Sequence, residues 1–324
     1  MKNFKVAEER NLKKILSALP SERGKYFFIA GGTDLLGEIK ENIISPEVVV
    51  DLNTIPGLSY IKKEDGQLHI GAMTTISSLA EDEAVKSLFP ALHQAANQVA
   101  TPQLRNMATA GGNLCQRPRC WYYRDPEINC RKKGGSRCFA LRGRNRYHAI
   151  LGGGICNIVH PSDLAPVLIA LDAKITISSP GGERTIPLEE FFILPRQNVR
   201  QENILAGNEV LTEISIPLPT KGEKSSYYKF KERGAWDFAL VSAAVKADVA
   251  EKTINRVKIA LGGVAPIPWR LSRAEKFIKG KRPSERLLRE AVREALREAK
   301  PLQENGYKKE LAEVVVTRAV LSLV

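Results

Sequence analysis

Every cysteine of this 324-residue chain lies within one short window, and this grouping constrains the fold more than any other feature of the sequence. The window is rich in Gly, Arg and Lys, and it closely follows a Thr-Ala-Gly-Gly-Asn sequence. Cysteines that only fill an apolar core would also occur elsewhere, so the grouping indicates either disulfide pairing or metal binding. The five residues are Cys115, Cys120, Cys130, Cys138 and Cys156.

The spacing of the cysteines leaves several interpretations open. Disulfides suit small secreted domains, whereas this chain is long, 43% hydrophobic and opens with charged residues, so we expect no secretory signal. Structural zinc sites usually contain close Cys-x-x-Cys pairs, which are absent here. The last four cysteines are separated by ten, eight and eighteen residues, which suits a cubane iron–sulfur cluster. Zinc and unligated cysteines stay open, and Cys115, beside apolar Leu114, suits a core position.

The charge around the cysteines favours a metal cluster. Residues 117–146 contain ten Lys or Arg against two acidic residues, so this segment contributes +8 to a formal net charge of +13. Cations stabilise the negative charge of a cluster with four thiolate ligands and raise its reduction potential. A solvated basic face and a docking surface for an acidic partner are the alternatives. We expect no nucleic-acid binding, because the cations alternate with Cys and Gly and no recognition motif is present.

The rest of the chain predicts an α+β fold. Helical and extended segments mix with hairpin signals at Asp65-Gly66 and at 180–182, which disfavours a doubly wound parallel sheet. No apolar run reaches eighteen residues, so we expect no membrane span. A Pro/Gly/charge break at 216–223 predicts a domain boundary. The expected helices are 7–19, 75–83, 89–100, 238–249, 285–296 and 308–323, and the expected strands are 25–30, 48–50, 58–61, 67–70, 173–178, 184–187, 227–230 and 256–261.

Two Gly-Gly turns predict a site for a phosphate-containing ligand. One follows the expected strand at 25–30, and the second lies at 109–113. Paired glycines let neighbouring backbone N–H groups point at one anion, although Gly-Gly after a strand is also common as a plain tight turn. The pattern is not the Gly-x-Gly-x-x-Gly fingerprint of a Rossmann domain. A third cluster at 71–75 could add hydroxyl contacts.

These motifs together carry a family resemblance. Ala-Gly-Gly-Thr-Asp at 30–34, Gly-Ala-Met-Thr-Thr at 71–75, Thr-Ala-Gly-Gly-Asn at 109–113 and His-Pro-Ser-Asp-Leu-Ala-Pro at 160–166 occur in this order. The chain resembles the FAD-binding (medium) subunit of the molybdenum hydroxylase family, which includes xanthine dehydrogenase. The resemblance spans nearly the whole chain. It implies a two-part FAD-binding domain at 1–220, with an iron–sulfur insertion at about 114–158, and a smaller α+β C-terminal flavoprotein domain at 221–324.

The resemblance also implies which residues bind the cofactors. For FAD, the diphosphate is expected on the two Gly-Gly turns and the ribityl or flavin end at Asp163, whose alternative role is a helix cap. The implied FAD residues are Phe28, Ile29, Ala30, Gly31, Gly32, Thr33, Asp34, Leu35, Thr74, Val99, Thr109, Ala110, Gly111, Gly112, Asn113, Asp163, Leu211 and Lys231. The insertion is similar to that of a subgroup with an extra [4Fe–4S] cluster, which includes 4-hydroxybenzoyl-CoA reductase and a bacterial aldehyde oxidoreductase. The implied cluster ligands are Cys120, Cys130, Cys138 and Cys156, with Cys115 as the alternative to Cys120.

The expected function is electron transfer in an oxidoreductase complex. The resemblance implies a molybdenum-cofactor large subunit that acts on the substrate and a small [2Fe–2S] subunit, in a heterotrimer or a dimer of heterotrimers. We expect a cytoplasmic location, or export with a partner subunit. Only four histidines are present and no Ser/His/acid set is recognisable, so we expect no acid–base catalysis by this chain. A stand-alone flavin oxidase and a basic zinc- or nucleic-acid-binding protein are the rival functions, and an absorption spectrum distinguishes all three.

Overall fold

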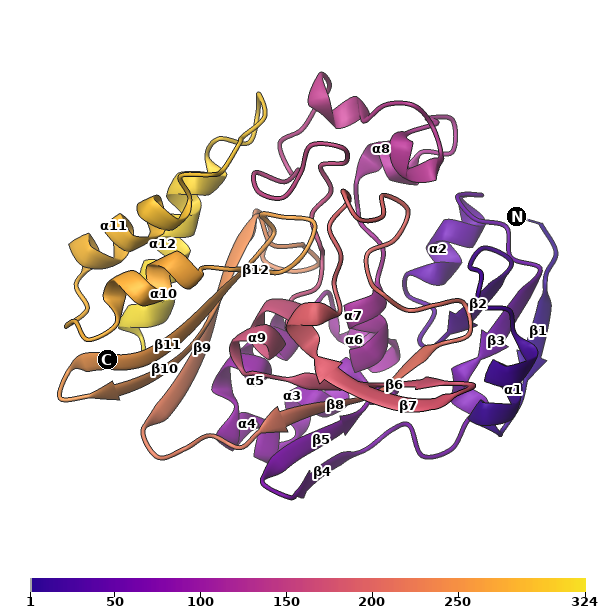
Figure 1. The fold of residues 1–324 in the computed structure, drawn as a ribbon, viewed down its shortest axis with the longest axis horizontal. Helices are drawn as coiled ribbons and strands as arrows, with labels where there is room; N and C mark the ends of the chain where they lie inside the picture. Colours follow the sequence, from indigo (N-terminus) through magenta and orange to yellow (C-terminus); the bar gives the residue numbers. More distant parts are fainter. Residues whose placement is uncertain (1) are drawn as a thin grey trace.

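Three separate β-sheets organise the computed structural model, which describes residues 2–324 (Figure 1). The first sheet is parallel, with strand order β1-β3-β2, and its strands are joined through helices as parallel pairing requires. The first Gly-Gly turn leaves the end of β2, so the sheet positions this turn at its edge. The elements are β1 (Lys5–Glu8), α1 (Leu12–Ala18), β2 (Tyr26–Ile29), α2 (Leu35–Lys40), β3 (Val48–Asp51) and the 3-10 helix η1 (Leu52–Thr54).

The second sheet is antiparallel, with strand order β4-β5-β8-β6-β7. Its first hairpin turns at Asp65 and Gly66, whose φ values of +47° and +72° are those of the tight turn that this dipeptide favours. Short helices cover the sheet, and α9 is buried along its whole length. The elements are β4 (Ile61–Glu64), β5 (Gln67–Gly71), α3 (Ile76–Glu81), α4 (Glu83–Leu88), α5 (Pro90–Gln98), α6 (Pro102–Met107), α7 (Ala110–Cys115), α9 (Leu164–Ala170), β6 (Lys174–Ser179), β7 (Gly182–Pro187), η4 (Leu188–Glu190) and β8 (Val210–Pro217).

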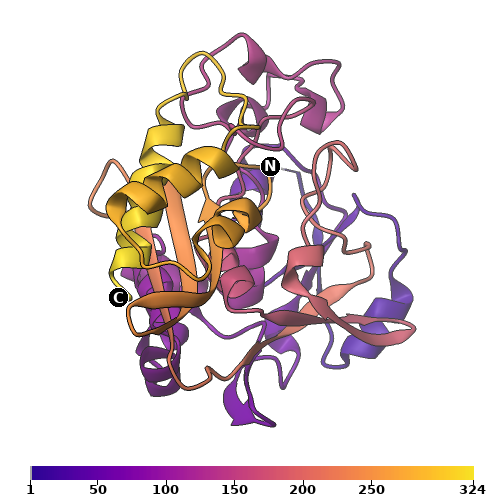
Figure 2. The same ribbon diagram turned by 60° about the vertical axis from the view of Figure 1, so that its left-hand side comes forward.

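The third sheet forms the C-terminal part, with antiparallel strand order β12-β11-β10-β9. Helices α10 to α12 pack on one face, and α5 and α9 of the preceding part contact β9, β10 and β11 (Figure 2). The predicted break at 216–223 spans the end of β8, the connecting turn and the first residue of β9, and the domain boundaries themselves stay predictions. The elements are β9 (Glu223–Phe230), β10 (Val241–Ala250), β11 (Thr253–Gly262), β12 (Trp269–Arg270), α10 (Ser272–Ile278), α11 (Glu285–Ala295) and α12 (Lys308–Leu321).

One expected helix was wrong. Residues 238–249 form most of strand β10, which pairs with β9 on one side and β11 on the other. Five consecutive residues from Val241 to Val245 are buried, because the strand is covered on both faces. A strand buried on both faces lacks the alternation of apolar and polar residues that identifies a strand in a sequence. Two further expectations agree only in part: β4 begins at Ile61, where the expected strand 58–61 ends, and residues 7–8 of the expected helix 7–19 belong to β1. The predicted α+β class is confirmed.

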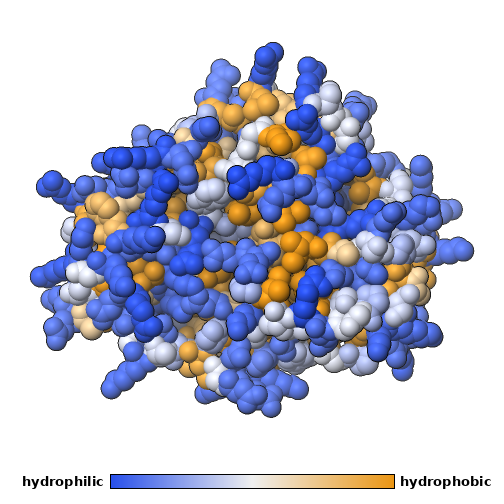
Figure 3. All heavy atoms as spheres, viewed as in Figure 1, coloured by the Kyte–Doolittle hydropathy of each residue, from blue (hydrophilic) through white to orange (hydrophobic). Residues whose placement is uncertain are grey.

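The cysteine-rich insertion contains little regular structure. It includes α8 (Trp121–Arg124) and the 3-10 helices η2 (Arg131–Lys133) and η3 (Phe139–Leu141), and it lies at the top of Figure 1. Figure 3 shows a largely hydrophilic face with apolar side chains that gather in its middle and at its top, over the insertion. The exposed apolar residues of the insertion are Trp121, Leu141, Tyr147 and Ile155.

A segment at 300–308, here called the C-terminal clasp, holds the end of the insertion. The amide of Asn305 donates to the carbonyl oxygen of His148 at 3.0 Å, and the ammonium of Lys308 donates to the carbonyl oxygen of Tyr147 at 2.9 Å. These bonds satisfy backbone groups that no strand or helix could satisfy in so irregular a loop. Among residues 2–324, no helix combines the length and apolar character needed to cross a bilayer.

Candidate functional site

A large cleft of about 890 Å³ lies where the first two sheets and the insertion meet. Its size falls within the range of ligand pockets, toward the upper end. One wall is the segment from β2 to the start of α2, and a second is the turn at 109–113. The loop before β8 and the first two residues of that strand, at 198–211, supply most of the third. Sequence reasoning missed this loop apart from Leu211, because it carries no glycine pair or other motif.

The first Gly-Gly turn offers four backbone donors to the cleft. Gly31, Gly32, Thr33 and Asp34 all line it, and their amide N–H groups have no hydrogen-bond partner within residues 2–324. Unpaired amides at a cavity are costly unless water or a ligand satisfies them. The φ of Gly32 is +69°, a left-handed value that glycine adopts without strain. These four free amides suit the anion-binding role that the sequence predicts for this turn, and that role stays a prediction.

The second Gly-Gly turn differs from that expectation, because its amides are used inside the protein. Ala110 donates to the carbonyl oxygen of Thr74 at 2.8 Å, and Gly111 donates to that of Ala72 at 2.8 Å. The amide of Gly112 donates to the Thr109 hydroxyl at 3.1 Å. These bonds dock the second turn against β5 and the segment that follows it, so the turn shapes the cleft wall but has few amides left for a ligand.

Close packing explains why the two turns need glycine. A Cβ on Gly31 would lie 1.7 Å from the carbonyl oxygen of Met107, just before the second turn. A Cβ on Gly111 would lie 2.8 Å from the Cβ of Ala72. Both distances are below contact distance, so the missing side chains allow the two walls of the cleft to approach each other.

The structure brings most of the predicted FAD residues together, but not all of them. Twelve of the eighteen line the cleft: Phe28, Ala30, Gly31, Gly32, Thr33, Asp34, Leu35, Thr109, Gly111, Gly112, Asn113 and Leu211. The other six do not: Ile29, Thr74, Val99, Ala110, Asp163 and Lys231. Lys231 lines a separate groove beside α11 and α12. Thr74 is buried and exchanges hydrogen bonds with the backbone of Tyr60. Contact with FAD stays a prediction for all eighteen residues.

Asp163 has both carboxylate oxygens engaged within the protein. The hydroxyl of Tyr227 and the ammonium of Lys229 each donate to it at 2.7 Å. All three residues are buried, and burial together with the charge of Asp163 raises the pKa of Tyr227 well above its usual value. The expected helix cap is made instead by the neighbouring Ser162, whose hydroxyl accepts from the amide of Ala165 at 2.9 Å. Asp163 therefore links α9 to β9.

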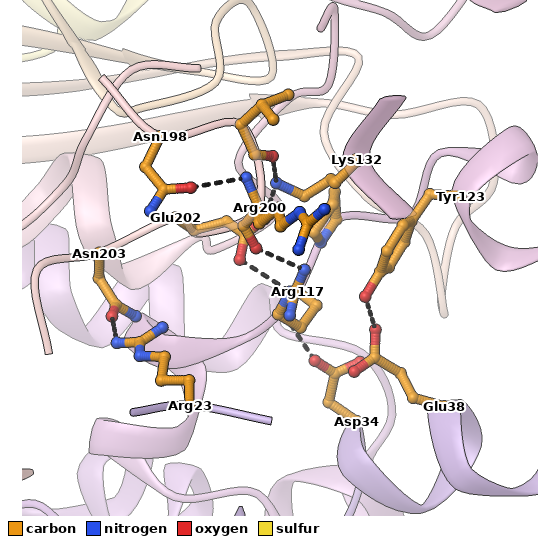
Figure 4. Close-up of polar contacts among 12 residues, drawn as sticks. Arg23, Asp34, Glu38, Arg117, Tyr123, Lys132, Asn198, Arg200, Glu202 and Asn203 are labelled. Carbon is orange, nitrogen blue, oxygen red and sulfur yellow. Dashed lines mark hydrogen bonds and ion pairs between the residues drawn. The ribbon is translucent and has the colours of Figure 1, made fainter. Parts of the chain in front are cut away.

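Asp34, which follows the two glycines of the first Gly-Gly turn, connects this turn to the insertion. Its carboxylate accepts the backbone N–H of Arg117 at 2.6 Å and pairs with the guanidinium groups of Arg119 and Arg124 at 2.8 and 2.7 Å. Beside it, Glu38 accepts the hydroxyl of Tyr123 (Figure 4). Burial is the main cause that raises the pKa of Glu38. These contacts place the cysteine segment directly beside the cleft.

A second, much smaller cavity gathers four of the five cysteines. Cys120, Cys130, Cys138 and Cys156 all line it, and no disulfide joins any of them. Cys115 lies apart in the wall of the large cleft, where burial raises its pKa to about 12. The free space is only about 10 Å³, enough for one water molecule. Within residues 2–324, no group of three or more His, Cys, Asp or Glu side chains is arranged to hold a metal ion.

Aromatic and basic side chains surround the four thiols. The Nε2 atom of His148 lies 3.2 Å from the sulfur of Cys120, and Trp121 packs edge-on against the His148 ring. Tyr122 stacks on Phe139 at 6.1 Å between ring centroids. Two cations, Arg131 and Lys132, line the cavity itself. The other exposed cations of the insertion do not line it, and they are Arg137, Arg142, Arg144 and Arg146. Cations beside the thiols suit a negatively charged metal–thiolate group.

Two family models match most of the chain. A model of the FAD-binding domain in molybdopterin dehydrogenases matches residues 2–126 and 137–219, and a model of the C-terminal domain of the carbon monoxide dehydrogenase flavoprotein matches 226–323. The unmatched residues 127–136 lie in the insertion and include Cys130.

Individual relatives extend this agreement. The aldehyde oxidoreductase FAD-binding subunit PaoB of Escherichia coli is 40% identical over 252 residues, covering 76% of this chain and 77% of that protein. The carbon monoxide dehydrogenase medium chain of Hydrogenophaga pseudoflava is 28% identical, with 90% and 87% covered. A solved carbon monoxide dehydrogenase from the same organism, which lacks the Mo-pyranopterin moiety of its molybdenum cofactor, superposes with a TM-score of 0.78 at 26% identity, covering 99% of this chain and 97% of that chain. The predicted family resemblance is confirmed, whereas none of these matches tests the subgroup with an extra cluster.

Proposed function

We propose a function from the family of this chain, which belongs to the FAD-binding subunits of the molybdenum hydroxylases. In this proposal the chain transfers electrons through FAD in the large cleft and a [4Fe–4S] cluster in the cysteine cavity. The observation that carries the flavin assignment is the row of four unpaired amides from Gly31 to Asp34. FAD supplies the exchange of single electrons and electron pairs. The protein supplies its position and its electrostatic surroundings.

The cleft offers each part of FAD a suitable environment. The amides of Gly31 to Asp34 would hold the diphosphate, because several N–H groups converge on one anion. Phe27 and Phe28 on one wall, and Leu205 on another, are apolar surfaces against which flat rings can pack. The Thr109 to Asn113 turn would support the cofactor from the opposite wall.

The donor set of the small cavity suits a [4Fe–4S] cluster. Four free cysteines from one insertion converge there, which is the ligand count that such a cluster requires. Binding would separate the thiols and widen the cavity, since the space between them now holds about one water. Gly134, four residues after Cys130, and Gly154, two residues before Cys156, have φ values of +105° and +110°, and glycine at these positions would let the backbone change conformation as the cavity widens. The cations beside the thiols would offset the charge of the loaded site.

Partner subunits complete the proposed complex. The relatives named above are subunits of an aldehyde oxidoreductase and of a carbon monoxide dehydrogenase. By this relationship we propose a molybdenum-cofactor large subunit that oxidises the substrate and a small [2Fe–2S] subunit, assembled as a heterotrimer or a dimer of heterotrimers. This chain would pass electrons between their iron–sulfur groups and an external acceptor or donor.

Iron and flavin analysis of the purified chain tests the proposal. The wild-type spectrum should combine flavin bands with broad iron–sulfur absorption. Cys138→Ala should remove roughly four irons per chain while FAD stays bound, whereas Cys115→Ala, outside the cavity, should leave the iron content unchanged. A colourless protein containing zinc would refute the proposal. Equal iron loss in both variants, or flavin loss with unchanged iron, would overturn the ligand assignment.

A further inference from the structure

The cysteine cavity and the large cleft share a wall made of two buried side chains. Tyr123 and Lys132 line both spaces, with relative exposures of 2% and 4%. One comes from α8 and the other from η2, so both belong to the insertion. A group on either side of this wall therefore lies close to the same charges.

Lys132 forms a buried ion pair in this wall. Its ammonium contacts one carboxylate oxygen of Glu202 and donates to the carbonyl oxygen of Val199 at 2.9 Å. The two charged side chains are only 1% and 3% exposed. Removing two such charges from water is costly, and a buried pair rarely adds net stability. Its position between two cavities therefore indicates a role other than holding the fold together.

The pair continues toward the cleft through Arg117. The second oxygen of Glu202 lies 2.7 Å from Nε of Arg117, whose guanidinium sits over the ring of Tyr123 at 5.1 Å. The backbone N–H of Arg117 in turn donates to the carboxylate of Asp34, in the first Gly-Gly turn. Figure 4 shows the continuous row of charges, with Glu202 between the two cations. The row runs from the thiols to the first Gly-Gly turn.

We propose that Lys132, Glu202 and Arg117 form a charge bridge that sets the relative electron affinities of the two redox groups. The proposal rests on the function proposed above. Charges in a buried site are screened far less than exposed ones, so each acts strongly on its near neighbour. Lys132 favours an added electron in the cysteine cavity, and Arg117 favours one on the flavin. Glu202 lies between the cations and disfavours an added electron on either side.

Removing either cation should change the difference between the two midpoint potentials, with opposite sign in the two variants. A purely structural role predicts no such opposite changes. Lys132→Met should lower the midpoint potential of the cysteine-bound group relative to that of the flavin, and Arg117→Met should do the reverse. Glu202→Gln, which keeps the shape of the side chain, should raise both potentials. We expect Lys132→Met to change the equilibrium constant for electron exchange between the two groups about tenfold, which corresponds to about 59 mV for one electron.

Redox titration of the complete complex, followed by visible absorption and electron paramagnetic resonance, measures both potentials. The matched control is Arg142→Met, which removes an exposed cation of the same insertion and should shift neither potential. Lys132→Arg keeps the charge and should keep the wild-type difference. If Lys132→Met loses iron, Glu202→Gln decides alone. Unchanged potentials in Glu202→Gln with iron and flavin retained would overturn the bridge. So would a change of the same sign, in Lys132→Met and Arg117→Met, in the difference between the potentials of the cysteine-bound group and the flavin. Wild-type protein without iron would instead refute the proposed function.

Discussion

Substituting alanine for Gly32 tests whether the proposed flavin site depends on the left-handed backbone conformation of this residue. At φ +69° an L-residue costs about 1–2 kcal/mol relative to glycine. The new Cβ would lie 2.9 Å from a terminal methyl of Leu36 and 3.3 Å from one of Ile29, and both are flexible side-chain ends. Backbone strain therefore dominates over steric clash.

The strain divides between two measurable quantities. If the turn keeps its conformation in the flavin-free protein, the free energy of unfolding falls by about 1–2 kcal/mol. If the turn relaxes, FAD must restore it, and the dissociation constant rises roughly 5- to 30-fold for the same energy. Urea unfolding of the flavin-free protein and titration with FAD, followed by quenching of flavin fluorescence, measure the two parts. Their sum should equal the strain.

Substitutions at two other glycines serve as comparisons for Gly32→Ala. Gly37 lies in α2 with open space around it, so Gly37→Ala should leave FAD affinity unchanged and stabilise the helix by up to about 1 kcal/mol. Gly31→Ala should be more damaging than Gly32→Ala, because its Cβ meets a backbone carbonyl at 1.7 Å. Wild-type stability together with wild-type FAD affinity in Gly32→Ala would refute the reasoning.

Two further predictions concern buried charges. Asp163→Asn should lower the free energy of unfolding in urea by about 3–5 kcal/mol, because it leaves the Lys229 ammonium buried without its partner. Asp172 is more exposed, so Asp172→Asn should lower that free energy by less than about 1 kcal/mol. Similar losses in both variants would contradict this prediction. Burial lowers the pKa of Lys308 to about 7 from 10.5, so the unfolded chain binds more protons between these values and stability should rise with pH across that window. Lys308→Met should flatten this rise and Lys309→Met should keep it, and a slope that survives in Lys308→Met would exclude Lys308 as its source.

The sequence predicts the fold best where local chemistry determines local structure. Asp65-Gly66 specifies its hairpin, and Ser284 caps α11 by accepting the amide of Leu287 at 3.3 Å. It fails where the surroundings decide. Strand β10 is covered on both faces and so shows no alternation, and β1 is a short edge strand whose residues are mostly exposed. Neither carries the periodicity from which strands are recognised.

The candidate site divides in the same way. The first Gly-Gly turn and the four converging cysteines are visible as motifs, because several residues of one type lie close together in the sequence. Glu202 is not visible, since a single acidic residue in a loop looks like any surface residue until the fold buries it beside Arg117 and Lys132. The internal use of the amides at 110–113 is likewise a property of tertiary contacts, which spacing alone does not encode.

The C-terminal clasp has a consequence for biogenesis. Its bond from Asn305 to His148 joins residues 157 positions apart, so the cysteine loop leaves the ribosome long before its clasp exists. At about 5–20 residues per second, this delay is roughly 8–30 s. During that interval the nascent thiols lack the contacts that hold the folded loop. Loading of the proposed cluster would therefore be timed by translation of the segment that later closes over it.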